Sequence, residues 1–121
     1  MVRREAQRLD DISNAIQEIK HFTADMDLRT YLSNRQVQQA VGLALVVIGE
    51  AIKALPPDLR GRHGAVAWVK WAGLRDFLVH QYFRIDQRRI WRIVQRDIPP
   101  LEAAMAAEQR RLTPGGLKPE G

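Results

Sequence analysis

The chain has 121 residues, a formal net charge of +5 and no cysteine. This length is enough for one domain that buries a core without help from metal or disulfides, and the lack of cysteine excludes disulfides and thiolate metal sites. The longest uncharged apolar run covers only residues 40–49, far short of the roughly 20 residues that span a bilayer. The charged N-terminus also lacks the apolar segment of a signal peptide. We therefore expect a soluble, cytoplasmic protein with no membrane partner.

Arginine supplies most of the positive charge, and the sequence pI is about 10.2. The planar guanidinium group is well suited to phosphate. Many basic proteins bind no nucleic acid, however, so the charge alone does not assign a partner.

Residues 2–22 form the first predicted helix, which contains neither glycine nor proline. Its apolar residues recur every three or four positions and charged residues occupy the other side, which is the pattern of an amphipathic helix. The predicted buried face consists of Leu9, Ile12, Ile16 and Ile19. Residues 23–25 end this helix, and either Asp25 or Asp27 can cap the next one.

Residues 28–55 form either one long helix or a short helix joined at residues 33–34 to a longer one. The centre, residues 40–48, is apolar all round. Such a helix is buried on all sides, either under its neighbours or in a subunit interface. Gly42 and Gly49 lie within it, each at a cost of about 1 kcal/mol relative to alanine, and the close approach of another helix would justify them.

Glu50 directly follows this apolar stretch. A buried carboxylate needs a cationic or hydrogen-bonding partner, and Arg75 is the first candidate. In the alternative interpretation Glu50 lies at the helix edge and meets solvent or Lys53, because acids are rarely buried unless they are paired.

Two prolines, Pro56 and Pro57, end this helix, and residues 58–64 are predicted as a polar loop. His63 in this loop is interpreted as a solvated residue. The next helix is predicted over residues 65–80, with two adjoining apolar stripes. The first stripe contains Val66, Val69, Gly73 and Phe77, and the second contains Ala67, Trp71, Leu74 and Leu78. His80 continues the first stripe, which predicts that it points inward or into a cleft.

Asp86 is predicted to cap a further helix with a buried face of Ile90, Trp91, Val94 and Ile98. A basic stripe with a spacing of four runs through Arg84, Arg88, Arg92 and Arg96. The prolines at 99–100 kink or restart the helix, which continues to Leu112, and residues 113–121 are predicted to be a flexible tail. The chain is therefore predicted to be all-α, an up-and-down bundle of four to five helices over residues 1–112.

Arg75, Asp76, His80 and Tyr82 interrupt the apolar pattern of the helix over 65–80 and its end. On a helix, Asp76 and His80 lie one turn apart on one face, and Arg75 and Tyr82 lie two turns apart on another. Arg75 and His80 are separated by roughly 140° around the axis. Both can act at one point only if the helix ends near Val79, or if a second copy of the chain completes the pair across a two-fold axis.

The candidate chemistry is limited by what the chain lacks. Ser13 and Ser33, the only serines, are far from His80 in sequence, which argues against a nucleophilic triad. The three histidines show no metal-ligand spacing and no phosphate-binding glycine loop is present, so no metal and no cofactor are expected. A histidine that exchanges a proton and an arginine that holds a phosphate suit metal-free cleavage of RNA, which supplies its own 2′-hydroxyl nucleophile. A hydrogen-bonded core histidine remains the alternative.

The segment from Arg75 to Tyr82 has four residues between Arg75 and His80 and continues as His80-Gln81-Tyr82. It resembles the R-x4-H-x-Y signature of the HepT-like toxins, a branch of the HEPN ribonuclease superfamily. The resemblance extends outward from this signature to Ile48-Gly49-Glu50-Ala51, to residues 68–74, to residues 85–91 and to residues 97–101. It covers roughly residues 4–112.

The resemblance implies a small all-helical homodimer that is a metal-independent endoribonuclease, the toxin of a toxin–antitoxin pair. The arginine and histidine would lie in a cleft at the dimer interface. The partner would be a nucleotidyltransferase antitoxin of the MntA type, which silences the toxin by transferring AMP from ATP to the motif tyrosine. A non-catalytic helical partner subunit of a nucleotidyltransferase is the alternative function.

Carried onto this chain, the resemblance assigns the scissile phosphate to Arg75, general acid or base catalysis to His80, and AMPylation to Tyr82. Asp76 is expected to orient the imidazole, and Glu50 to support Arg75. The basic stripe Arg84, Arg88, Arg92 and Arg96 is not part of the signature; it is assigned to RNA phosphate or to the acidic surface of a partner, with a solvated face as the alternative.

Overall fold

The computed structural model describes residues 2–112, so the tail predicted over residues 113–121 lies outside the described residues. Within residues 2–112 the chain is helical and contains no strand. Its elements are α1 (Val2–Thr23), α2 (Leu28–Leu32), α3 (Arg35–Lys53), α4 (Pro57–Gly61), α5 (Trp68–Gln81), the 3-10 helix η1 (Tyr82–Arg84), α6 (Gln87–Arg96) and α7 (Ile98–Arg111). The predicted all-α class is confirmed, and α2 and α4 are short additions to five longer helices.

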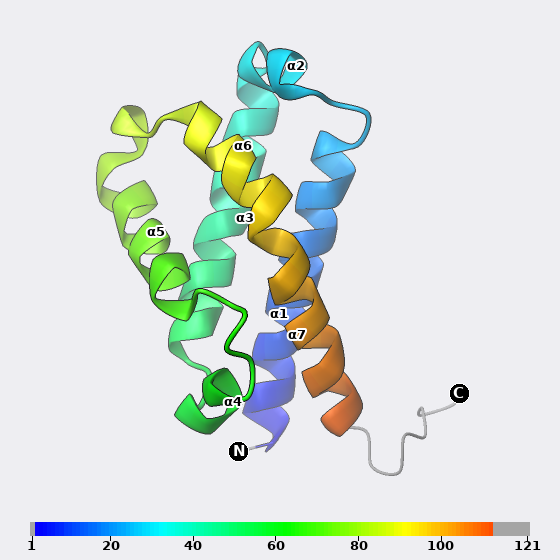
Figure 1. Cartoon of the computed structure of the whole chain (residues 1–121). Coiled ribbons are helices and arrows are strands. Elements are labelled where there is room, and N and C mark those ends of the chain that lie inside the picture. Colours follow the sequence, from blue (N-terminus) through cyan, green and yellow to red (C-terminus); the bar gives the residue numbers. More distant parts are fainter. Residues whose placement is uncertain (1, 113–121) are drawn as a thin grey trace.

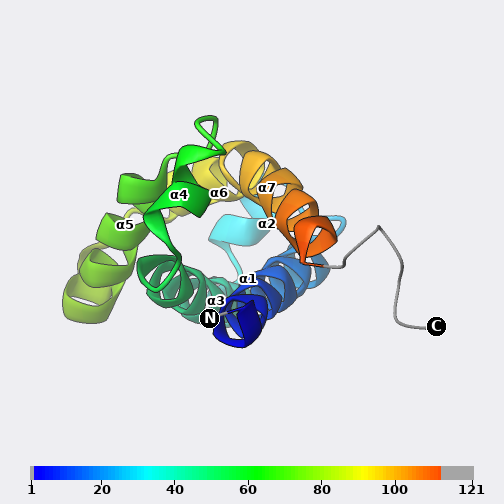
Figure 2. The ribbon, with the colours of Figure 1, turned by 90° about the horizontal axis from the view of Figure 1, so that it is seen from below.

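The longer helices run up and down (Figure 1). α1 and α5 run in one direction, while α3 and the successive pair α6 and α7 run in the other. α3 packs against both α1 and α5, and α7 closes the bundle against α1. Seen from below, α6 lies across the bundle from α3, and α7 leads from it to the side of α1 (Figure 2). In the described part of the chain, no helix combines the length and the apolar character needed to cross a membrane.

Capping explains why residues 28–55 form two helices. The Asp27 side chain accepts from the Thr30 backbone N–H, and the Thr30 hydroxyl accepts from the Asp27 backbone N–H, which makes a complete capping box at the start of α2. The Asn34 side chain accepts from the Val37 N–H at 3.0 Å and starts α3. Of the two predicted caps Asp27 is therefore correct, whereas Asp25 ends the preceding turn with a φ of 62°.

The core confirms the face predicted for α1, because Leu9, Ile12, Ile16 and Ile19 are fully buried. The prediction that α3 is buried all round under its neighbours is wrong for a single chain. Leu43 is 68% exposed and Val47 is 40% exposed. An apolar strip of α3 therefore faces outward, and only the subunit-interface alternative would bury it.

The two glycines of α3 lie at close contacts with α5 and with η1. A Cβ placed on Gly49 would lie 2.3 Å from the Arg75 Cβ and 2.9 Å from the Trp71 carbonyl oxygen. A Cβ on Gly42 would lie 3.2 Å from the Tyr82 ring. A side chain at position 49 would push α3 and α5 apart, so the predicted close approach of another helix is confirmed there, whereas at position 42 the Tyr82 ring would have to shift slightly.

The polar loop predicted over 58–64 is wrong in two respects. Residues 57–61 form α4, and His63 is half-buried, with its Nε2 2.6 Å from a Glu108 carboxylate oxygen. Glu108 is only 1% exposed and receives two hydrogen bonds from Arg62, at 2.7 and 3.1 Å. The Arg62 guanidinium holds the pKa of Glu108 below its usual value. This cluster ties the segment before α5 to the end of α7.

The outward face of α5 also differs from the prediction. Trp71, Leu74 and Leu78, from the second stripe, are buried, whereas Val69 in the first stripe is almost fully exposed. His80 follows the exposed stripe and lies at the surface. Of the two predictions for His80, the inward position is therefore wrong for the single chain, and a position in a cleft stays a prediction.

Candidate functional site

Four charged side chains join α3 to α5. Arg75 Nε lies 2.8 Å from a Glu50 carboxylate oxygen, and Arg75 Nη1 donates to the Asp76 carboxylate at 3.0 Å. Lys53 donates to the same Asp76 oxygen at 2.7 Å. The Glu50–Arg75 pair predicted from the sequence is confirmed, but the Glu50 side chain is 61% exposed, so its expected burial is wrong.

The network fixes Arg75 without using all its donors. Arg75 Nε is buried and lies 2.8 Å from Glu50 without an aligned hydrogen bond, and the hydrogen bond of this guanidinium within the described residues is the one from Nη1 to Asp76. A guanidinium carries five N–H donors in a fixed plane. Arg75 is therefore held in one position with N–H groups left to bind an anion.

Asp76 acts on Arg75 in this chain. Hydrogen bonds from Lys53 and then Arg75 lower the pKa of the Asp76 carboxyl. Among the described residues, Asp76 makes no hydrogen bond to His80. The orienting role expected for Asp76 at the imidazole is absent from this geometry, because both cations compete for its carboxylate.

His80 lies on the outer face of α5, opposite the buried Trp71, Leu74 and Leu78. Within the described part of the chain, its imidazole has no hydrogen bond or ion pair. This argues against the alternative of a hydrogen-bonded core histidine. The helix does not end near Val79 but continues to Gln81, where the backbone leaves the helix with φ −140° and ψ 37°. This break comes after both Arg75 and His80, so residues 75–80 lie on one regular helix, and completion of the pair by a second copy stays a prediction.

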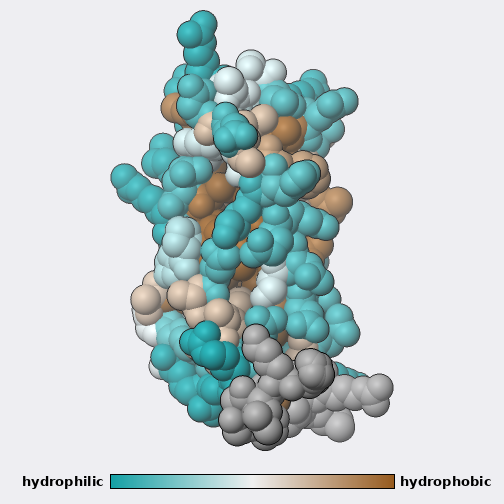
Figure 3. Space-filling view, turned by 90° about the vertical axis from the view of Figure 1, so that its right-hand side faces the viewer, coloured by the Kyte–Doolittle hydropathy of each residue, from teal (hydrophilic) through white to brown (hydrophobic). Residues whose placement is uncertain are grey.

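Large apolar side chains are exposed on α3 and α5, the helices that carry this site, and on η1 and α1. Leu43 and Val47 on α3, Val69 and Val79 on α5, and Phe83 on η1 are all exposed, with Phe22 on α1 the sixth. We call the surface carried by Leu43, Val47 and Val79 the α3–α5 face. By contrast, the side of the molecule carried by α1 and α7 is mostly hydrophilic (Figure 3). Exposed apolar side chains that gather on one surface commonly mark a site where a partner binds.

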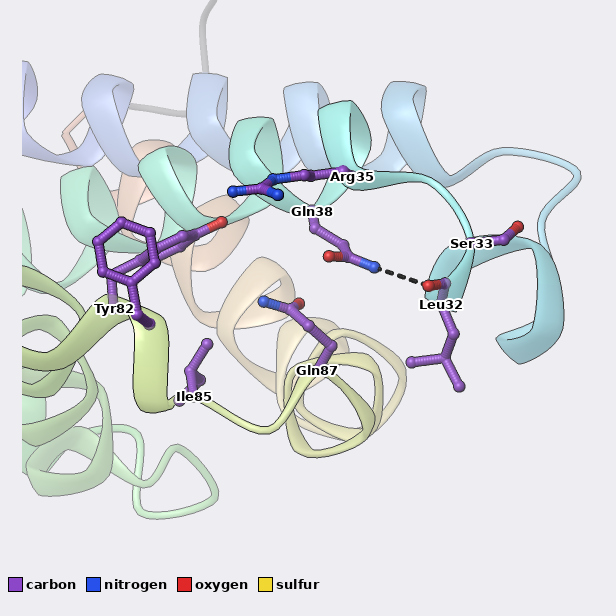
Figure 4. Close-up of a pocket in the computed structure, with 8 residues that line it drawn as sticks. Leu32, Ser33, Arg35, Gln38, Tyr82, Ile85 and Gln87 are labelled. Atoms are coloured by element: carbon purple, nitrogen blue, oxygen red, sulfur yellow. Dashed lines mark hydrogen bonds between the residues drawn. The ribbon is translucent and has the colours of Figure 1, made fainter.

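Tyr82 lies just beyond the end of α5 and is half-buried against Gly42. Its ring meets that of Phe83 edge to face, with centroids 5.6 Å apart. Both aromatic residues line a cavity of about 280 Å³ between η1 and the α2–α3 junction (Figure 4).

The predicted basic stripe is exposed along η1 and α6, and Asp86 caps α6 as expected, accepting from the Arg88 N–H at 2.9 Å. The spacing of four missed two further cations. Arg89 of α6 and Lys70 of α5 line a hollow of about 290 Å³ together with Arg92 and Arg96. The pair of consecutive arginines, Arg88 and Arg89, could have indicated from the sequence that Arg89 adds to the basic surface. In the described residues, no group of three or more His, Asp or Glu side chains is arranged to hold a metal ion.

Comparison with known proteins places these residues in a family. The sequence model described as "Ribonuclease HepT-like" matches residues 12–108, which include Glu50, Arg75, His80 and Tyr82. "Probable ribonuclease HepT" of Thermococcus cleftensis is 39% identical over 102 residues, which cover 84% of this chain and 93% of the relative.

Two proteins of Methanocaldococcus jannaschii, each named "Putative RNase", are similar as well. One is 37% identical over 78% of this chain and 81% of its own length, and the other is 36% identical over 78% and 86%. No solved structure matches the chain significantly. The length of the family match and the coverage of these relatives show that the chain belongs to the HepT-like ribonuclease family.

Proposed function

We propose that the protein is a metal-independent endoribonuclease that acts as a homodimer and is the toxin of a toxin–antitoxin pair. The proposal rests on where the two signature side chains, Arg75 and His80, lie in a chain of this ribonuclease family. His80 is exposed and has no partner among residues 2–112, and Arg75 is held between Glu50 and Asp76. A proton-transfer group and an anion-binding group are what cleavage by the RNA's own 2′-hydroxyl requires.

In the proposed reaction the 2′-oxygen attacks the adjacent phosphorus while the bond from phosphorus to the 5′-oxygen breaks. His80 accepts the proton of the 2′-hydroxyl or donates a proton to the departing 5′-oxygen. Arg75 stabilises the negative charge that grows on the phosphate oxygens. The products are a 2′,3′-cyclic phosphate and a 5′-hydroxyl, and no step needs a metal ion.

Two copies of the chain would form the active cleft. Arg75 lies where α5 meets α3, whereas His80 points outward from the far side of α5. The α3–α5 face offers the apolar surface that a second copy would cover. A two-fold axis there repeats every contact twice and brings Arg75 and His80 to one groove.

Glu50 and Asp76 are proposed to position Arg75, and the stripe Arg84, Arg88, Arg92 and Arg96 to bind RNA phosphates. Tyr82 is proposed as the residue to which an MntA-type nucleotidyltransferase partner transfers AMP. Tyr82 follows His80 by two positions and lines a cavity. An added nucleotide would place bulk and negative charge where the RNA must lie.

Incubation of the purified protein with RNA in excess chelator tests the reaction. The proposal predicts cleavage without added metal and fragments that end in a 2′,3′-cyclic phosphate and a 5′-hydroxyl. Cleavage that stops on chelation, or fragments with a 3′-hydroxyl, would overturn it, because a metal-activated water would then be the nucleophile.

A further inference from the structure

The cavity beside Tyr82 has the features of a built binding pocket. It is an open cavity lined by two segments that are distant in sequence: the α2–α3 junction, and η1 with the start of α6. Figure 4 shows polar ends of Tyr82, Arg35, Gln38 and Gln87 directed toward the same space. Neither the family signature nor the proposed catalytic pair accounts for Arg35, Gln38 or Gln87.

Hydrogen bonds to the protein fix how the two glutamines face the cavity. Gln38 Nε2 donates to the carbonyl oxygens of Tyr31 and Leu32, at 3.0 and 3.1 Å, so the Gln38 oxygen is the atom left free. Gln87 shows the opposite arrangement. The fully buried Tyr31 hydroxyl donates to the Gln87 oxygen at 2.6 Å, and burial raises the pKa of Tyr31, so this donor stays protonated. The Gln87 amide nitrogen is thus left free.

The cavity therefore presents one fixed acceptor, at Gln38, and one fixed donor, at Gln87. Every nucleobase carries donors and acceptors side by side on its edge, and proteins read unpaired bases by such contacts together with aromatic stacking. Phe83 is 89% exposed at this cavity and offers a face for stacking. Arg35, at the start of α3, adds a cation for a phosphate, where the positive end of the helix dipole also favours an anion.

We propose that this cavity is a subsite for one unpaired nucleotide of the RNA substrate, close in the chain to His80. The inference rests on the proposed ribonuclease function and deepens it. The base stacks on Phe83 and its edge bonds to Gln38 and Gln87, while Arg35 binds the phosphate. The enzyme then prefers single-stranded RNA and favours one base at a fixed position from the cut.

Binding of short fluorescent oligoribonucleotides of A, C, G or U, measured by anisotropy, tests the subsite. All proteins carry His80→Ala so that the RNA is not cut. Gln87→Glu keeps an oxygen to accept from Tyr31 but replaces the free donor with an acceptor. We expect it to change the order of preference among the four bases. Phe83→Ala, a surface change, should weaken binding of all four at least about fivefold through lost stacking.

Arg29→Ala is the matched control for Arg35→Ala. Both arginines are exposed at the same end of the molecule, but Arg29 does not line the cavity. Arg35→Ala should weaken binding more than Arg29→Ala. The subsite is overturned if the His80→Ala protein binds none of the four RNAs, or if Gln87→Glu lowers all four affinities equally and Phe83→Ala leaves them unchanged. Because binding is measured without cleavage, failure of the subsite is distinguishable from failure of the ribonuclease reaction itself.

Discussion

Gly49 of α3 lies directly beneath Arg75 of α5. A Cβ on Gly49 would be 2.3 Å from the Arg75 Cβ, nearer than two such carbons approach in proteins. The absence of a side chain at position 49 therefore sets both the spacing of the two helices and the place of the arginine proposed to bind phosphate. Glu50, the next residue, then reaches Arg75 Nε at 2.8 Å.

Gly49→Ala is expected to destabilise the fold by about 1–3 kcal/mol, the usual cost of overpacking a tight contact. The clash involves the Trp71 backbone as well as Arg75 Cβ, so no rotamer change relieves it. Thermal unfolding followed by circular dichroism should show a melting temperature several degrees lower. RNA cleavage should fall as well, because Arg75 is displaced.

Gly73→Ala is the matched control on the same helix pair. A Cβ at Gly73 meets nothing within 4 Å. Alanine in a helix interior is favoured over glycine by about 0.5–1 kcal/mol, so this variant should melt at a higher temperature than the wild type. Equal effects of the two substitutions would contradict the close-contact account.

Glu108→Gln is expected to lose about 2 kcal/mol of stability at pH 7, because a buried carboxylate bonded to Arg62 and His63 becomes neutral. The folded-state pKa of Glu108 lies below its ordinary value of 4.5. Its contribution is therefore fully present above that ordinary value and is lost as the pH falls through the lower, folded-state pKa.

Urea unfolding of the two proteins at pH 7 and near pH 3 measures this contribution. The difference in unfolding free energy should be large at pH 7 and should shrink below pH 4.5, because Glu108 of the unfolded wild type then binds a proton more readily than Glu108 of the folded protein. A difference that stays constant over this range would mean that the Glu108 charge does not stabilise the fold.

Leu43→Glu tests the proposed dimer. Leu43 is 68% exposed in the single chain, so the change should alter monomer stability by less than about 0.5 kcal/mol. Placed across a two-fold axis, however, it puts two buried charges in an apolar interface. Sedimentation analysis should show a dimer for the wild type and a monomer for the variant, together with loss of RNA cleavage.

Ala106→Glu, at an exposed position of α7, is the control for Leu43→Glu and should remain dimeric. A wild-type protein that sediments as a monomer yet cuts RNA would contradict the shared cleft. So would a Leu43→Glu variant that stays dimeric.

Tyr82→Phe tests the modification site. Co-expression with the partner nucleotidyltransferase should add the mass of one or more AMP groups to the wild-type chain and none to the variant, as read by intact mass spectrometry. Tyr31, the other tyrosine, is fully buried and should stay unmodified. AMP found on the Tyr82→Phe protein would refute the assignment.

The sequence predicted those features that local periodicity and chemistry encode. The α1 face, the glycine contact of α3 and the Glu50–Arg75 pair all follow from spacing and from the need to compensate charge. The two stripes of α5 adjoin and are both apolar, so periodicity could not tell which one faces the core. Packing of α5 against α3 decides, and Trp71, Leu74 and Leu78 are the residues that it buries.

Features that depend on distant contacts were missed. His63 is half-buried because Glu108, 45 residues later, folds back over it. The cavity beside Tyr82 needs the α2–α3 junction, η1 and α6 to meet. Asp76 bonds to Lys53, 23 residues earlier, in place of its helical neighbour His80. No local pattern reveals such competition between partners.

Cleavage of RNA by His80→Ala in the presence of chelator tests the central claim most directly. His80 is exposed and without a partner among the described residues, so its loss should leave the melting temperature unchanged. The rate should fall about 100- to 10,000-fold, the usual contribution of a general acid or base. His21→Ala, at an exposed position of α1, should cut at the wild-type rate. Equal cleavage by wild type and His80→Ala would contradict the assignment of His80 as the catalytic residue.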